Sequence, residues 1–303
     1  MGSQDKPFRT VEEQVAILKS RGISFADEKQ AEAFLLRENY YAVVNGYKDA
    51  FLDKQATNLA GEDRYPQGLP FEALMFAYLF DGILRRSTIS VLLEAETNVK
   101  TAVTYAFCEA HGEPEDYLDP SCYCRKSDYR QSDRYTKVLI RLLSTLQSIR
   151  DNRQHKPYIK HYVNHHGCLP LWVASKCMTF GNLSSFFDFQ QQCVKTKACI
   201  ALAQSLGRNK VRQRELVYAL HTLPEFRNIC AHEERLYCAR TGKNSDKGFP
   251  ELLRALKTVV TEESYGRYLR EVGIVLDSLE AKSPSLKDMF LKGMGISMED
   301  LAA

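Results

Sequence analysis

The chain has 303 residues, of which 44% are hydrophobic and 26% charged, the balance of a globular protein with a sizeable core. Its formal net charge of +3 is too small to indicate nucleic-acid binding, so the local placement of basic residues must decide that question. The nine cysteines include no CxxC pair, and their odd number fits reduced thiols in a cytosol better than a disulfide framework.

The sequence gives no sign of a membrane segment or a metal. It has no apolar signal core near its start, no complete myristoylation pattern and no apolar run of about 20 residues. Cys122 and Cys124 form a CxC with no second pair, so we expect no structural zinc there. We therefore expect a cytoplasmic protein with no cofactor and no metal.

The first predicted helix begins after Thr10, with Glu13 as its capping-box partner, and ends at Gly22. A second helix is expected near Asp27. Gly46 indicates a bend, and the polar stretch 53–69 is typical of a loop or linker.

Pro70 fits the first turn of the next helix, and a separate helix is expected from about Ser87 to Cys108. Two pairs stand four residues apart and can interact along a helix: Asp81 with Arg85, and Glu96 with Lys100. If exposed, each is worth only about 0.3–0.5 kcal/mol.

The second half of the chain is also predicted to be helical. Residues 111–134 look irregular, and Phe180-Gly181-Asn182-Leu183-Ser184 looks like a turn. Helices are expected at 135–149, from about 169, from Phe186, at 193–206, through Leu216 to Leu223, at 252–260 and at 265–279. Strand signals are nearly absent, so the predicted fold class is all-α.

A possible catalytic group lies in Arg227-Asn228-Ile229-Cys230-Ala231-His232. On a continuous helix, Asn228, His232 and Arg235 share one face, and the long side chain of Arg227 can reach round to it. A histidine can transfer the protons of RNA phosphodiester cleavage, and an arginine can bind the phosphate and stabilise its developing negative charge. The alternatives are anion or nucleotide binding, or a structural histidine, because such short motifs also arise by chance.

Pro224 kinks this helix or begins a new one with Thr222 as cap and Glu225 as capping-box partner. Either outcome places Arg227 in the first turns of a helical segment, where free backbone N–H groups favour an anion.

Two basic segments are candidates for RNA contact. One contains Arg208, Lys210, Arg212 and Arg214. The other, 151–167, is rich in histidine, with tyrosines that can stack on bases. Its His161 and His165 stand at helical spacing but lack a third metal ligand, so a solvated basic face is the favoured interpretation.

RNICAHEERLY resembles the R-N-x-x-A-H-x-x-R-L signature of the Abi (abortive infection) family of phage-defence proteins, AbiD/AbiF-like, within the HEPN superfamily. The similarity extends along nearly the whole chain. Further resembling segments are KPFRTVEEQVAILKSRGI, ENYYAVVNGYKDAF, LFDGILRRS, LPLWVASKCMTFGNLSSFF and MGIS.

The resemblance implies a HEPN-type helical bundle (61–303) with an N-terminal helical extension (1–60). It implies a metal-independent endoribonuclease toxin in which Arg227, Asn228 and His232 of two chains meet in a homodimer. Arg235, Lys100 and the Arg208–Arg214 cluster are then expected to contact RNA. Partners of family members include a small non-coding RNA or an antitoxin. The alternative is a non-catalytic HEPN module that binds RNA or a nucleotide, or acts as a sensor.

The sequence departs from the family pattern at several positions. Pro224 interrupts a stretch that is usually continuous helix, and Lys100 stands where the family has an arginine, which exchanges a bidentate contact for a point charge. Glu233 replaces a second histidine that is common there. Position 234 is Glu, so the tyrosine that an adjacent nucleotidyltransferase modifies in some HEPN toxins is absent.

Overall fold

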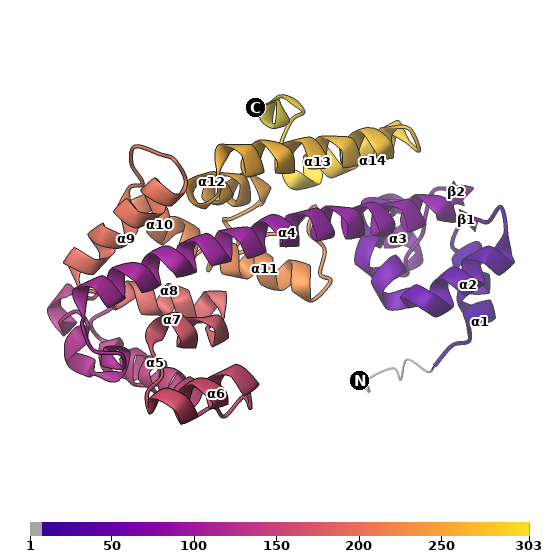
Figure 1. The fold of residues 1–303 in the computed structure, drawn as a ribbon. Helices are drawn as coiled ribbons and strands as arrows, with labels where there is room; N and C mark the ends of the chain where they lie inside the picture. Colours follow the sequence, from indigo (N-terminus) through magenta and orange to yellow (C-terminus); the bar gives the residue numbers. More distant parts are fainter. Residues whose placement is uncertain (1–7, 303) are drawn as a thin grey trace. The chain divides into compact units, whose positions relative to one another are not determined.

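The computed structural model describes residues 8–302, whose regular secondary structure is almost entirely helical (Figure 1). The predicted all-α class is confirmed, since the only strands in the described part of the chain are β1 (Ile23–Ser24) and β2 (Leu69–Pro70). The chain divides into two compact units. Among the described residues, unit 1 contains 8–87 together with Glu233–Ala239 and Arg270–Ala302, and unit 2 contains Thr88–His232 and Arg240–Leu269.

Unit 1 begins with two helices that start where the sequence predicts. Thr10 caps α1 (Val11–Ser20) in a complete capping box with Glu13, and Asp27 caps α2 (Glu28–Glu38). Between them, Gly22 adopts a φ of +108°, and a Cβ there would lie 2.6 Å from the Tyr65 carbonyl oxygen. This close approach lets β1 pair in parallel with β2.

Two predictions in unit 1 are wrong. Gly46 is not a bend, because its backbone is helical at the end of a π-helical turn (η1, Tyr41–Asn45), which precedes a 3₁₀ turn (η2, Lys48–Ala50). The stretch 53–69 is not only loop, because it contains α3 (Lys54–Ala60) and half of β2. Asp53 caps α3, and Gly61 ends it in the left-handed conformation, so both local signals are present in the polar sequence.

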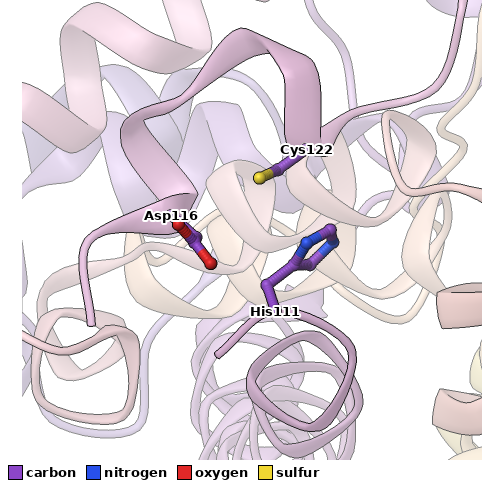
Figure 2. A group of neighbouring side chains, drawn as sticks. All are labelled: His111, Asp116 and Cys122. Atoms are coloured by element: carbon purple, nitrogen blue, oxygen red, sulfur yellow. The ribbon is translucent and has the colours of Figure 1, made fainter. Parts of the chain in front are cut away.

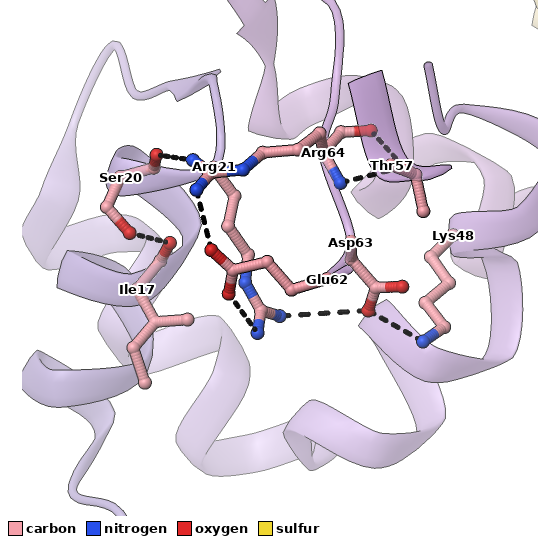
Figure 3. A network of polar contacts seen from close by, with 8 residues as sticks. All are labelled: Ile17, Ser20, Arg21, Lys48, Thr57, Glu62, Asp63 and Arg64. Atoms are coloured by element: carbon pink, nitrogen blue, oxygen red, sulfur yellow. Dashed lines mark hydrogen bonds and ion pairs between the residues drawn. The ribbon is translucent and has the colours of Figure 1, made fainter. Parts of the chain in front are cut away.

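A polar network joins the pieces of the N-terminal part of unit 1 (Figure 3). Arg21, at the end of α1, pairs with Glu62 at 3.4 Å and with Asp63 at 3.7 Å. Arg64 pairs with Glu62 and donates to the Ser20 carbonyl, so the chain after α3 is tied to the end of α1.

α4 (Phe71–Ala110) is one 40-residue helix where the sequence predicts two. Its residues up to Ser87 belong to unit 1 and those from Thr88 to unit 2. The predicted break at Ser87 is wrong because Arg86, Ser87 and Thr88 contain neither glycine nor proline, and the side chain of Thr88 is fully buried.

Unit 1 is completed by the residues of α13 (Glu262–Glu280) from Arg270 onwards, α14 (Pro284–Met294) and a 3₁₀ turn (η7, Glu299–Leu301). The sequence did not predict α14. The ring of Tyr237 stacks between Tyr47, with centroids 5.9 Å apart, and Phe290, with centroids 4.6 Å apart. The segment Glu233–Ala239 is therefore held in the core of this unit.

Unit 2 contains the other helices. After α4 come three 3₁₀ turns in the segment predicted to be irregular: η3 (Asp116–Leu118), η4 (Pro120–Cys122) and η5 (Lys126–Asp128). The remaining elements are α5 (Tyr135–Arg150), α6 (Pro157–His166), α7 (Leu171–Ala174), η6 (Ser175–Cys177), α8 (Phe180–Asp188), α9 (Gln192–Ser205), α10 (Gln213–Leu220), α11 (Leu223–Ala231), α12 (Phe249–Val259) and the first turns of α13.

The predicted turn at 180–184 is wrong, since Thr179 caps α8 there and Phe180, Leu183 and Phe187 are buried on one face. α10 packs on α8, α9 and α12, which makes it central to unit 2. Among residues 8–302, no helix is long and apolar enough to cross a membrane.

Candidate functional site

The short helix α11 carries the Arg–Asn–His group of unit 2. Its apolar stripe of Leu223, Phe226 and Cys230 is buried, and the helix packs against α10 and α12. Asn228 and His232 are exposed, and Arg227 is half-buried. Packing of one face therefore fixes the helix and leaves the polar face accessible.

Pro224 begins a new helix, which was one of the two predicted outcomes. α10 ends at Leu220, and Thr222 is the N-cap residue of α11. The predicted capping box is wrong, because the Thr222 side chain makes no cap bond. Glu225 instead accepts a 2.7 Å hydrogen bond from the Gly242 N–H, which ties α11 to the loop after the motif.

The motif ends where the helix ends. His232 is the C-cap residue of α11, and its N–H donates to the Asn228 carbonyl at 2.9 Å. Asn228 and His232 thus keep the helical spacing that the sequence predicts. Arg227 is the fifth residue of α11, so the free N–H groups of the first turn precede it, and His232 lies at the opposite end.

Arg235 does not share that helical face, so this prediction is wrong. Glu233 adopts a φ of +58°, and the helix cannot continue through it. Arg235 belongs to unit 1, where its guanidinium lies 3.8 Å from the exposed carboxylate of Asp49.

Within residues 8–302, the side chains of Arg227, Asn228 and His232 form no hydrogen bond or ion pair. An exposed imidazole, an amide and a guanidinium are thus available to a ligand. The guanidinium and the amide can donate hydrogen bonds to a phosphodiester, and the imidazole can accept or donate a proton. One chain supplies one such histidine, whereas cleavage needs a base and an acid.

The other residues predicted to contact RNA differ in their surroundings. Lys100 pairs with Glu96 at 3.0 Å and donates to the Met178 carbonyl at 2.9 Å. Arg208 donates to the Lys257 and Val260 carbonyls, which end α12. The charges of Lys100 and Arg208 are therefore engaged inside unit 2.

Lys210, Arg212 and Arg214 lie at the surface. Arg212 pairs with Glu215 at 3.4 Å, and all three line a cavity of about 650 Å³ between α9 and the loop before α10. In the histidine-rich segment, the rings of His161 and His165 lie 4.3 Å apart on α6.

A buried network in unit 1 holds the chain that follows the motif. The Asp81 carboxylate accepts hydrogen bonds from the Tyr47 hydroxyl (2.7 Å), the Arg85 guanidinium (3.0 Å), and the Leu236 and Tyr237 N–H groups (3.0 and 2.9 Å). Burial raises the pKa of Asp81, and the donors oppose that rise. The sequence placed Asp81 and Arg85 on one helix but gave no signal of their burial.

A family model described as Abi-like protein matches residues 33–238, which is more than half of the chain. This protein belongs to the Abi-like family. The match includes α4 with Asp81 and the whole of α11 with His232. No curated protein and no solved structure matches the chain. Membership in this family points to abortive-infection phage defence.

Proposed function

We propose that this Abi-like protein is a metal-independent endoribonuclease toxin of the AbiD/AbiF type, within the HEPN superfamily, and acts as a homodimer. The observation that carries the proposal is the group on α11. Arg227, Asn228 and His232 lie on a helix fixed by its buried face, and their side chains have no partner among the described residues. Membership in the Abi-like family also supports the proposal, because RNA cleavage can arrest the growth of an infected cell.

The proposed reaction is transesterification. His232 of one chain removes the proton from the RNA 2′-hydroxyl, whose oxygen attacks the adjacent phosphorus. Arg227 binds the phosphate and stabilises its developing charge, and Asn228 orients these groups. The histidine of the second chain protonates the leaving 5′-oxygen. The products are a 2′,3′-cyclic phosphate and a 5′-hydroxyl.

The test is incubation of RNA with the full-length protein in the presence of EDTA. His232→Ala should lower the cleavage rate by about 10²–10⁴-fold, the usual contribution of an acid–base group. The matched control is His221→Ala, because His221 also caps a helix C-terminus but pairs with Asp188 at 3.0 Å. A 2′-deoxy substitution at the cleaved position should block the reaction.

Three results would overturn parts of the proposal. If EDTA abolishes cleavage but leaves the helix content and the melting temperature unchanged, the metal-free mechanism is excluded. Equal cleavage by wild type and His232→Ala excludes the assigned base. RNA retained without cleavage by both proteins identifies a non-catalytic binding or sensor module, the alternative function.

The dimer has its own test. After subunit exchange, adding excess His232→Ala to wild type should reduce the total cleavage rate, because mixed dimers lack one of the two histidines. If each chain cleaves independently, the rate stays proportional to the wild-type concentration, and the shared site is excluded.

A further inference from the structure

Three side chains with metal-binding atoms meet at the end of α4, in a part of unit 2 that the proposed function does not use. They are His111, Asp116 and Cys122 (Figure 2). Their nitrogen, oxygen and sulfur atoms all lie within 4.8 Å of one another. Figure 2 shows His111 directly after the helix, with the other two side chains pointing at it from the 3₁₀ segment.

The spacing of these atoms is close to that of a metal site. Zinc bonds of about 2.0–2.3 Å in tetrahedral geometry place the ligand atoms about 3.3–3.8 Å apart. At the 4.8 Å limit, each separation must shorten by about 1.0–1.5 Å, a change within the reach of side-chain rotation.

The surroundings hold the donors in place. The backbone N–H of His111 donates to the Phe107 carbonyl, and the His111 and Phe107 rings pack with centroids 4.4 Å apart. One Asp116 oxygen accepts a 3.0 Å hydrogen bond from the Glu113 N–H, which leaves the other oxygen for a ligand. Cys122 is only 9% exposed.

One polar atom in this cluster lacks a partner. The Nε2 atom of His111 is buried and, among residues 8–302, has no hydrogen-bond partner. A buried nitrogen without a partner costs about 1–3 kcal/mol. A metal ion bound through this nitrogen supplies the missing interaction.

We propose that His111, Asp116 and Cys122 bind a zinc ion that joins the end of α4 to the segment of η3 and η4. A thiolate, an imidazole and one carboxylate match zinc, whereas magnesium and calcium take oxygen ligands. The three side chains leave a fourth position for water. Because the hydrogen bonds of 3₁₀ turns have poorer geometry than those of an α-helix, an ion bound here stabilises the segment of η3 and η4.

The full-length protein is first freed of metal with a chelator and then titrated with Co²⁺, which replaces zinc and gives a charge-transfer band when a thiolate binds. We expect one such band per chain in the wild type and none in Cys122→Ser. Zn²⁺ should displace Co²⁺ and raise the melting temperature. Asp116→Asn, which keeps its shape and its bond to the Glu113 N–H, should weaken Zn²⁺ binding at least about 10-fold.

Cys124→Ser is the matched control, because Cys124 is also buried and lies two residues away but is not part of the cluster. It should bind Co²⁺ like the wild type. Circular dichroism confirms that each variant is folded, and Asp116→Asn keeps the test decisive if Cys122→Ser does not fold. No thiolate band in the wild type, a band that persists in Cys122→Ser, or binding lost only in a His161→Ala, His165→Ala double variant would each overturn the proposal.

Discussion

Asp81→Asn is expected to destabilise unit 1 strongly, although it changes one oxygen to nitrogen. Asp81 is fully buried and its partner Arg85 is 7% exposed, so the substitution leaves a buried guanidinium without its counter-charge. Breaking a buried ion pair from one side costs about 3–5 kcal/mol. The new amide also cannot accept from both the Leu236 and Tyr237 N–H groups as the carboxylate does.

The matched control is Glu109→Gln on the same helix. Glu109 pairs with Lys197 at 2.8 Å, but the two side chains are 46% and 42% exposed. Exposed pairs contribute about 0–1 kcal/mol, so this variant should unfold almost like the wild type. Urea denaturation of both variants measures the difference.

Hydrogen exchange locates the effect. In Asp81→Asn, the amides of Leu236 and Tyr237 should exchange faster than in the wild type, because both lose a charged acceptor. Adding Arg85→Met should recover part of the stability by removing the unpaired charge. An unfolding free energy within 1 kcal/mol of the Glu109→Gln value, with unchanged exchange of these two amides, would refute the reasoning.

Three further predictions test the packing of each unit. Arg208→Met should destabilise unit 2 by about 1–3 kcal/mol in urea unfolding, because its guanidinium bonds the carbonyls that end α12. Gly293→Ala should destabilise the protein by about 1–3 kcal/mol, because the added Cβ would lie 2.6 Å from the ring of Tyr237. Gly273→Ala is the contrast: the added Cβ meets nothing within 4 Å, so this variant should stabilise α13 by about 0.5–1 kcal/mol. Thermal melts of the two variants measure the opposite shifts. Burial raises the pKa of Cys199 to about 11, so at pH 8 iodoacetamide should label the exposed Cys193 first, as mass spectrometry can show.

Local signals in the sequence predicted local structure well. The capping box of Thr10 and Glu13 was correct because its two partners lie three residues apart, and the second helix begins near Asp27 as predicted. α3 was missed for a different reason. Its caps are present at Asp53 and Gly61, but the helix between them buries no residue, so the sequence shows no apolar periodicity.

Long-range contacts explain the larger errors. The sequence placed Asp81 beside Arg85 but did not show its burial, because its other donors come from residues 34, 155 and 156 positions away. Lys100 and Arg208 are visible as charges in the sequence, but the carbonyls that they bind are not. A sequence shows which residues carry charge, and only the fold shows which charges are already engaged.

The candidate site was predictable as far as the helix extends. Asn228 and His232 keep their spacing because residues 223–231 form regular helix. Arg235 was placed wrongly because Glu233 turns the chain with a positive φ, which a glutamate rarely adopts and which no sequence pattern indicates. The proposed zinc ligands give no sequence signal, because His111, Asp116 and Cys122 follow no common zinc-ligand spacing and only the fold brings them together.

The two proposals affect the same assay, and one variant separates them. EDTA removes a structural zinc as well as a catalytic one. If EDTA lowers both the cleavage rate and the melting temperature, the loss of cleavage is explained by the loss of the structural zinc. Asp116→Asn weakens zinc binding without touching α11. If this variant is folded and still cleaves RNA in EDTA, the ion acts only on the segment after α4. If it is folded and inactive, and Zn²⁺ restores cleavage without changing the melting temperature, the metal takes part in the reaction and the metal-free mechanism is wrong.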